Sequence, residues 1–471
     1  MVFSSAIFLV IFLPITIVLY FLLGSVITKK TAVKNFILLT ASLVFYAWGE
    51  PVYIFLMLIS ICFNFIVGRD MAFAKKSEQG KKAKSLFVFA IVFNLAVLGF
   101  FKYSDFLVEN LNSLLSIKLK PLNLPLPVGI SFYTFQIMSY IIDLYNDRIK
   151  AQKSILNFAL YVSLFPQLIA GPIVKYKDIA EQLSNREENW SKFSKGMNRF
   201  IVGLSKKLIL ANTLGAVYTS VQEAGNENMS ILTAWIGIIC YTLQIYFDFS
   251  GYSDMAIGLG GIFGFSFNEN FKYPYMATSV TDFWRRWHIS LSSWFRDYVY
   301  IPLGGNRKST PRVILNLLIV WFLTGLWHGA AWNFIAWGVY YGVLLILEKY
   351  IFKNTLEKIP NTAKRAITMI IVMVGWVLFS SANLSEALEY IRIMFGGARP
   401  VDSDGAYLFL TNIPLILIGC FCSVPMYKKL TSIFDENKLS KVKIIAAPLL
   451  LIICIIFMIS ETYNPFLYFR F

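Results

Sequence analysis

Apolar stretches long enough to cross a bilayer recur along the whole chain, and they constrain its fold more than any other feature. Of 471 residues, 57% are hydrophobic and only 15% are charged, with a mean hydropathy of +0.61. Soluble domains carry about 25% charged residues. In lipid, backbone polar groups must be satisfied within the element, so such runs form helices. The runs do not alternate apolar and polar residues, which argues against an outer-membrane barrel.

We therefore predict an all-α polytopic membrane protein with about 11 transmembrane helices plus re-entrant and interfacial helices. No internal repeat, low-complexity segment or soluble part is evident, and residues 1–471 are expected to form a single membrane-embedded domain. The first run lacks a basic leader, which favours a retained span over a cleaved signal and places its start outside. The candidate spans are residues 5–24, 35–48, 51–67, 85–101, 128–145, 154–173, 230–248, 250–265, 313–327, 333–347, 366–381, 409–425 and 444–460.

The net charge of +16 reflects basic residues that cluster in short loops between the runs. Such residues orient a membrane chain and meet anionic lipid, and no nucleic-acid motif is present. We expect membrane lipid as a partner and no nucleic acid. The segments predicted to be cytoplasmic are 69–84, 282–312, 348–365 and 428–443, which leaves residues 396–408 and the tail 463–471 outside.

The five cysteines all lie in apolar runs and none has zinc-ligand spacing with a histidine. We interpret them as small packing residues and predict no metal site. They are Cys62, Cys240, Cys420, Cys422 and Cys454.

His328 is one of two histidines in the chain and lies in an otherwise apolar stretch, residues 321–332. A neutral imidazole accepts and returns a proton near pH 7, and polar groups in lipid-buried segments usually face a cavity or a partner. Arg312 precedes it by about 24 Å of helical rise, so His328 is predicted to lie deep, toward the outer half of the bilayer. Two roles are compatible with such a residue. It could act in catalysis or ligand contact, or it could be a structural histidine that is hydrogen-bonded to a backbone carbonyl. Metal binding is disfavoured, because no second ligand stands at suitable spacing.

The surroundings of His328 follow from helical spacing. Gly325 and Gly329 form a small-xxx-small pair that permits close helix contact, and Asn333 is a nearby polar group. The expected helical neighbours are Trp321, Thr324, Gly325, Ala331 and Trp332.

His288 lies in a segment rich in tryptophan and arginine, residues 282–298. Helical spacing gathers the aromatic residues on one face, which predicts an interfacial amphipathic helix. Two functions are compatible with this segment. It could anchor the protein to the membrane surface, or it could form a cytoplasmic vestibule for an anionic donor such as coenzyme A, with His288 at the mouth of the vestibule. Direct cooperation with the deeper His328 is not expected unless the helices bend strongly. The donor-binding residues of such a vestibule would be Arg285, Arg286, Trp287 and Arg296.

Asp248 and Asp254 stand between two apolar runs. Six residues apart, they do not share a face of a continuous helix, and Gly251 between them predicts a break. A proton path or cavity lining is one explanation for two carboxylates here, and ion pairs with the arginines of residues 285–296 are the other.

Proline and glycine interrupt two further apolar segments. Residues 127–136 open a span in which Gln136, Ser139 and Tyr140 are candidates to line a cavity. Residues 165–172 predict a kink or re-entrant turn. Packing alone also explains both.

Six segments together resemble the membrane-bound O-acyltransferase (MBOAT) family, in particular its bacterial alginate O-acetylation branch. They occur in order over most of the chain, and the two that contain Trp-His are the most specific. The segments are PVGISFYTFQ (127–136), FPQLIAGPI (165–173), YFDFSGYSDMAIG (246–258), DFWRRWHISLSSWFRDYVYIPLGGNR (282–307), GLWHGAAWNF (325–334) and NPFLYFRF (464–471).

The resemblance implies a ring of tilted helices around a thinned centre, where a cytoplasmic funnel meets an outer funnel. It implies that His328 is the active-site histidine and His288 the second signature histidine, on the cytoplasmic side. It also implies no bound cofactor, an acyl-thioester donor such as acetyl-CoA as substrate, and an extracytoplasmic SGNH-type esterase or acetyltransferase as partner.

The expected function is transfer of an acyl group, most simply acetyl, from a cytoplasmic thioester toward an extracytoplasmic polysaccharide, in a multi-pass protein of the bacterial cell (inner or plasma) membrane. His328 would act as general base or align the thioester carbonyl. The alternatives are D-alanyl transfer to teichoic acid, a polysaccharide exporter or flippase, and a scaffold that recruits an esterase.

Overall fold

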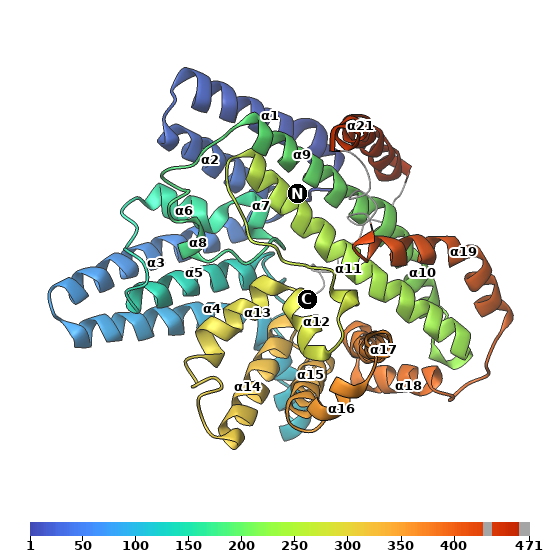
Figure 1. Ribbon diagram of the computed structural model, residues 1–471. Helices are drawn as coiled ribbons and strands as arrows, with labels where there is room; N and C mark the ends of the chain where they lie inside the picture. Colours follow the sequence, from blue (N-terminus) through green and yellow to red (C-terminus); the bar gives the residue numbers. More distant parts are fainter. Residues whose placement is uncertain (427–435, 461–471) are drawn as a thin grey trace. The chain divides into compact units, whose positions relative to one another are not determined.

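The computed structural model describes residues 1–426 and 436–460, and all regular secondary structure in these ranges is helical (Figure 1). Nine of the helical segments so described are long and apolar enough to cross a membrane, by length and composition. This confirms the all-α polytopic class. The segments are Ile7–Ile27, Thr31–Gly49, Tyr53–Lys76, Gly80–Leu115, Trp190–Glu223, Ile231–Ile262, Thr310–His328, Asn361–Ser380 and Ser403–Cys422.

Two expectations about the spans are corrected. Residues 190–223 were not predicted to span, yet they form one helical run of α9 (Trp190–Ser205), the π-helical η3 (Lys206–Ala211) and α10 (Asn212–Glu223). The predicted break at Gly251 is absent, because α11 runs continuously over Ile231–Ile262. The predicted tail 463–471, with the NPFLYFRF segment, and part of the basic segment 428–443 lie outside the described residues.

By internal packing the chain divides into two compact units. Unit 1 comprises Met1–Phe200 and Met255–Asn268, and unit 2 comprises Ile201–Asp254 and Glu269–Phe471. The single membrane domain expected from the sequence stays a prediction.

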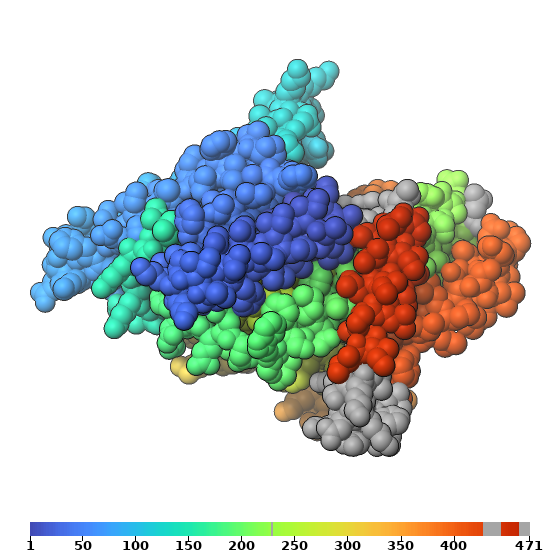
Figure 2. Space-filling model, turned by 90° about the horizontal axis from the view of Figure 1, so that it is seen from above, coloured from blue at the N-terminus to red at the C-terminus, as the bar shows by residue number. Residues whose placement is uncertain are grey.

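Unit 1 begins with the helical run η1 (Ile7–Phe12), α1 (Leu13–Leu19) and η2 (Tyr20–Ile27), followed by α2 (Thr31–Gly49). Helices α3 (Tyr53–Lys76), α4 (Gly80–Leu115) and α5 (Ile130–Tyr145) then pack side by side (Figure 1). With 36 residues, α4 is about 54 Å long and exceeds the bilayer's hydrocarbon thickness. Its end and the loop that follows stand out from the rest of unit 1 (Figure 2). The side chain of Leu114, near the end of α4, is 80% exposed.

The proline- and glycine-rich segments of unit 1 are deeply buried. Gly129, with φ +76°, precedes α5, and a Cβ there would lie 2.8 Å from the carbonyl oxygen of Leu168. The predicted break near Pro166 is confirmed, since α6 (Ile155–Ser163) ends before Leu164 and the short α7 (Phe165–Leu168) follows. Gln136 and Ser139 are fully buried, with the Ser139 hydroxyl donating to the Gln136 carbonyl. A cavity lined by these residues stays a prediction.

Unit 1 also contains α8 (Tyr176–Ile179).

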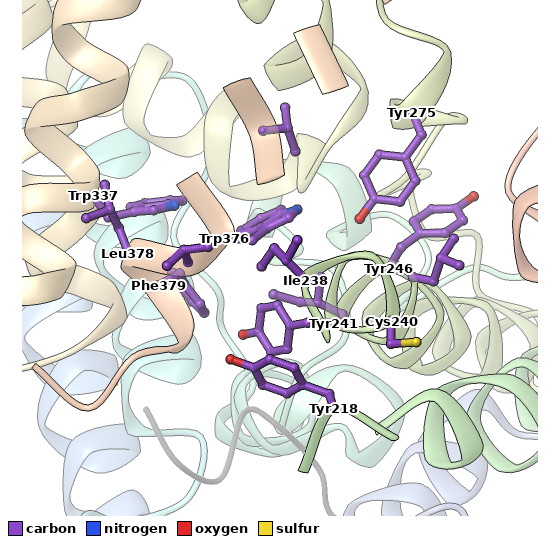
Figure 3. Packing of buried hydrophobic residues seen from close by; sticks show 14 of the residues in the cluster. Tyr218, Ile238, Cys240, Tyr241, Tyr246, Tyr275, Trp337, Trp376, Leu378 and Phe379 are labelled. Carbon is purple, nitrogen blue, oxygen red and sulfur yellow. The ribbon is translucent and has the colours of Figure 1, made fainter. Parts of the chain in front are cut away.

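Unit 2 is built around buried aromatic residues that come from α11, α12 (Val280–Arg286), α15 (Trp332–Tyr350) and α17 (Asn361–Ser380). Figure 3 shows Trp337, Trp376 and Phe379 on one side of this core and Tyr218, Tyr241 and Tyr275 on the other. Further helices in the described part of unit 2 are η4 (Asn226–Asn228), η5 (Pro274–Met276), α13 (Ile289–Phe295), η6 (Arg296–Tyr300), α14 (Thr310–His328), α16 (Lys353–Lys358), α18 (Leu384–Met394), α19 (Ser403–Cys422) and α21 (Glu436–Ser460).

Helices α14 and α15 approach each other through glycine. A Cβ on Gly325 would overlap the carbonyl oxygen of Phe334, and a Cβ on Gly338 would overlap that of Trp321. Small residues allow backbones to approach this closely in membrane proteins. The predicted close contact at Gly325 is therefore confirmed, with Gly338 as its partner in α15.

The cysteines are free thiols. Cys240 and Cys454 are buried, as expected of packing residues, whereas Cys62, Cys420 and Cys422 are exposed.

Candidate active site

His328 is the last residue of α14 and lies among aromatic rings. Its side chain is 7% exposed. The centroid of its imidazole is 5.0 Å from the ring of Trp327, 4.9 Å from Trp337 and 5.2 Å from Phe379, and each contact is edge-to-face. Figure 3 shows Trp337 and Phe379 side by side in this core. Three aromatic walls thus fix the position of the imidazole.

The end of α14 places His328 because the helix cannot continue. Gly329 is extended (φ −167°, ψ 158°), and a Cβ there would overlap the ring of Phe334. The Asn333 amide donates to the carbonyl of Ser381 at 2.9 Å and ties the start of α15 to the end of α17. Because α14 ends at His328, Ala331 and Trp332 do not continue its helix as expected, and Trp337 and Phe379 supply ring contacts from α15 and α17.

His288 lies between α12 and α13 in a left-handed conformation, with φ 44° and ψ 53°. The single amphipathic helix predicted for residues 282–298 is therefore wrong, because the segment breaks at Trp287 and His288 into two short helices. Its aromatic face is buried in the protein, so a membrane-surface anchor does not describe it. The buried residues are Trp284, Trp287, Leu291, Trp294 and Phe295.

The rings of both histidines contact one tryptophan, Trp327. The His288 and Trp327 rings are 6.0 Å apart between centroids, and Trp327 precedes His328 in the chain. The large separation expected from helical rise is wrong, because α12 and α13 are inside unit 2 rather than on a surface. His288 is 4% exposed, and burial lowers its pKa to about 3. Its imidazole is therefore neutral at pH 7.

The residues predicted to bind the donor fall into two groups. Arg285 is exposed, Arg286 pairs through Nε with Asp282 at 2.8 Å, and the Arg296 side chain is 62% exposed. Trp287, in contrast, is 4% exposed and packs between Phe283 and Trp376, with ring centroids 5.6 and 4.9 Å away. Its geometry is that of a core residue.

The two carboxylates of α11 pair with lysines of η3. Asp248 lies 2.7 Å from Lys207, with side chains 2% and 4% exposed, and Asp254 lies 2.6 Å from Lys206. Gly251 does not break the helix but permits a close approach, since a Cβ there would lie 2.8 Å from the carbonyl oxygen of Gly203. Charged groups buried this deeply in a membrane chain are costly unless paired. These lysine partners were not predicted from the sequence.

Several residues around the histidines carried a signal in the sequence. The consecutive lysines 206 and 207 interrupt an apolar run, which marks them as candidates for pairing with the carboxylates of α11. Trp337 and Trp376 are bulky aromatic residues in predicted spans, but their approach to the histidine segments depends on tertiary packing. In the described part of the chain, no group of three histidine, cysteine or acidic side chains is arranged to hold a metal ion.

Comparison with known proteins agrees with this architecture. Residues 9–385 match the model of the MBOAT, membrane-bound O-acyltransferase family. A probable alginate O-acetylase AlgI of Pseudomonas aeruginosa is 43% identical, over 84% of this chain and 75% of the relative. A peptidoglycan O-acetyltransferase of Helicobacter pylori is 33% identical, over 100% of this chain and 98% of the relative. A teichoic acid D-alanyltransferase of Bacillus subtilis is 28% identical, over 55% of this chain and 68% of the relative.

The helical architecture and the extent of these matches lead to one conclusion. The chain belongs to the membrane-bound O-acyltransferase family and is a multi-pass membrane O-acyltransferase.

Proposed function

We propose that this protein moves an acyl group, most simply acetyl, from a cytoplasmic thioester donor toward a polysaccharide outside the bacterial cell (inner or plasma) membrane. The observation that carries the proposal is the placement of both histidines around Trp327 within unit 2. The relatives named alginate and peptidoglycan O-acetyltransferases support acetyl as the group and a polysaccharide as the final acceptor.

His328 is the proposed general base. The imidazole takes the proton of the attacking hydroxyl, whose oxygen forms a bond to the thioester carbonyl carbon. The carbon–sulfur bond then breaks, and the leaving thiolate takes the proton back from the imidazolium. The products are an ester and a free thiol. A positioned base contributes typically 10²–10⁴-fold to such a rate.

His288 and the arginines have supporting roles in the proposal. The low pKa of His288 keeps its imidazole neutral, so it offers one donor and one acceptor to orient the thioester. We propose that the exposed Arg285 and Arg296, the latter paired with Asp297, attract the phosphates of coenzyme A. We propose that the hydroxyl which attacks belongs to an extracytoplasmic SGNH-type partner, which then acylates the polymer.

Replacement of the base tests the proposal. His328→Gln keeps the shape of the side chain and removes its basicity at neutral pH. Cells that carry this variant in place of the wild type should lose alkali-labile acetate from their polysaccharide, while the protein remains in the membrane at normal level. Asn316→Leu, which alters a buried polar residue of the same helix, is the control for membrane insertion. Normal acetate content with His328→Gln would refute the assignment.

D-alanyl transfer is the alternative within the same family. Membranes that contain the protein together with its acceptor partner should release coenzyme A from acetyl-CoA if the proposal is right. If a D-alanyl thioester on a carrier protein is consumed and acetyl-CoA is not, the D-alanyl alternative replaces it. An exporter or a scaffold would consume neither.

A further inference from the structure

The turn at His288 is held from outside its own helices by residues 269–273. The carbonyl oxygen of Asn270 accepts from the Ile289 backbone N–H at 3.0 Å. The Oδ1 atom of Asn270 accepts twice from Ser290, from its backbone N–H at 3.1 Å and from its hydroxyl at 2.9 Å. The Lys272 N–H donates to the carbonyl of Arg286 at 2.9 Å. Residues 269–273 therefore bind the chain on both sides of His288.

The turn needs this support because of its conformation. A side chain with a Cβ is disfavoured at φ 44°, and such a conformation persists only where the surroundings determine it. Asn270 is 2% exposed, so water does not compete for its hydrogen bonds. Phe271 adds a wall, with its ring 5.1 Å from Trp287 and 6.3 Å from His288 between centroids.

We infer that Asn270 is a positioning residue, whose amide oxygen holds the left-handed turn and thereby keeps the His288 imidazole against Trp327, next to His328. It touches no reacting atom itself. That the turn matters for transfer rests on the proposed function of His288, whereas the mechanical role of Asn270 does not.

Chemical modification tests the mechanical role without any substrate. The chain has two histidines, so diethyl pyrocarbonate followed by mass spectrometry reports on each separately, with His328 as reference. Asn270→Leu removes the acceptor at nearly constant volume and should raise the labelling rate of His288 by about tenfold or more, because local opening exposes it. Equal labelling of His288 in wild type and Asn270→Leu would overturn the inference.

Asn316→Leu is the matched control. Asn316 is also fully buried in unit 2, where its amide donates to the carbonyls of Leu303 and Gly305 at 3.3 and 3.4 Å. Asn316→Leu loses the same kind of hydrogen bond, but its partners are not the residues on either side of the His288 turn. His288 should label at the wild-type rate in this variant. A rise equal to that of Asn270→Leu would show general loosening and would also overturn the inference.

A double-variant experiment tests the link to transfer. Its readout is coenzyme A release from acetyl-CoA by cell membranes that contain the protein together with its acceptor partner. Asn270→Leu should lower the rate by about 10- to 100-fold in the wild-type background. In a His288→Asn background, where the imidazole is already absent, it should lower the rate further by less than about twofold. Equal losses in both backgrounds would show that Asn270 does not act through His288. If wild-type protein releases no coenzyme A, the proposed donor is wrong, and the labelling result still decides the role of Asn270.

Discussion

The two histidine segments of unit 2 reach the same aromatic cluster by different means. His328 ends a regular helix, and a glycine after it and glycine contacts with α15 set its position. His288 occupies a left-handed turn between two short helices, and bonds from residues 269–273 set its position. The first arrangement combines the end of α14 with packing against α15 and Phe379. The second is built by residues distant in the chain, and we expect it to be the more easily disturbed.

Loss of Lys207 should have the largest effect and should act on the His288 side. Lys207→Met leaves Asp248 charged in a buried position, which costs about 3–5 kcal/mol of stability. Asp248 precedes Phe249, whose ring contacts Trp287 at 6.4 Å between centroids. His288 labelling should therefore rise while His328 labelling does not.

Two controls sharpen this result. Lys207→Met combined with Asp248→Leu should recover much of the stability, because no buried charge remains. Lys206→Met should cost less, since the Lys206 and Asp254 side chains are 24% and 16% exposed. Equal melting temperatures for the two single lysine variants in detergent would contradict this expectation.

Gly325→Ala should act on the His328 side. The added methyl overlaps the Phe334 carbonyl, so α14 and α15 must separate, and displacement of His328 should lower the transfer rate by about 100-fold. Gly342→Ala is the milder control, since its Cβ would lie 3.2 Å from the Trp321 side chain. The rate of coenzyme A release distinguishes Gly325→Ala from Gly342→Ala. Similar rates for the two variants would argue that close contact between α14 and α15 does not position His328.

Acid should destabilise the protein through His288. Its pKa is about 3 in the folded state and about 6.5 unfolded, so the unfolded state binds the proton first. Stability should be unaffected by this group above pH 6.5 and fall by up to about 1.4 kcal/mol per pH unit below it. His288→Asn removes the titrating group while tolerating the left-handed turn. Its melting temperature between pH 6.5 and 5 should decline less steeply than that of the wild type, and parallel curves would contradict the buried, neutral state of His288.

The exposed arginines should give the smallest effect. Arg285→Ala or Arg296→Ala should raise KM for acetyl-CoA by about two- to fivefold with kcat unchanged, because exposed charges attract weakly. The effect should fade between low salt and about 0.5 M salt, where charges are screened. Arg392→Ala removes an equally exposed arginine that pairs with Glu389 and should leave KM unchanged. A salt-independent KM would exclude these arginines from donor attraction.

Local features of the amino-acid sequence were sufficient to predict the class of the molecule. Apolar run length predicts membrane helices, and the close helix contact at Gly325 is a local feature too, whereas the end of α14 at His328 was not predicted. The sequence predicts such features because hydrogen bonding within a helix and steric exclusion at glycine depend on neighbouring residues. The Trp-His segments further identified the family, which the comparisons show.

Only the tertiary structure decided how the two histidine segments meet. Periodicity over residues 282–298 matched a surface helix, yet Asn270 and Lys272 bind the chain around His288 and hold a left-handed turn there. Likewise, Asp248 pairs with Lys207 across two helices. Hydrogen bonds and ion pairs between distant residues overrode the local helical preference, because in a buried, water-poor setting they outweigh the modest cost of breaking a helix.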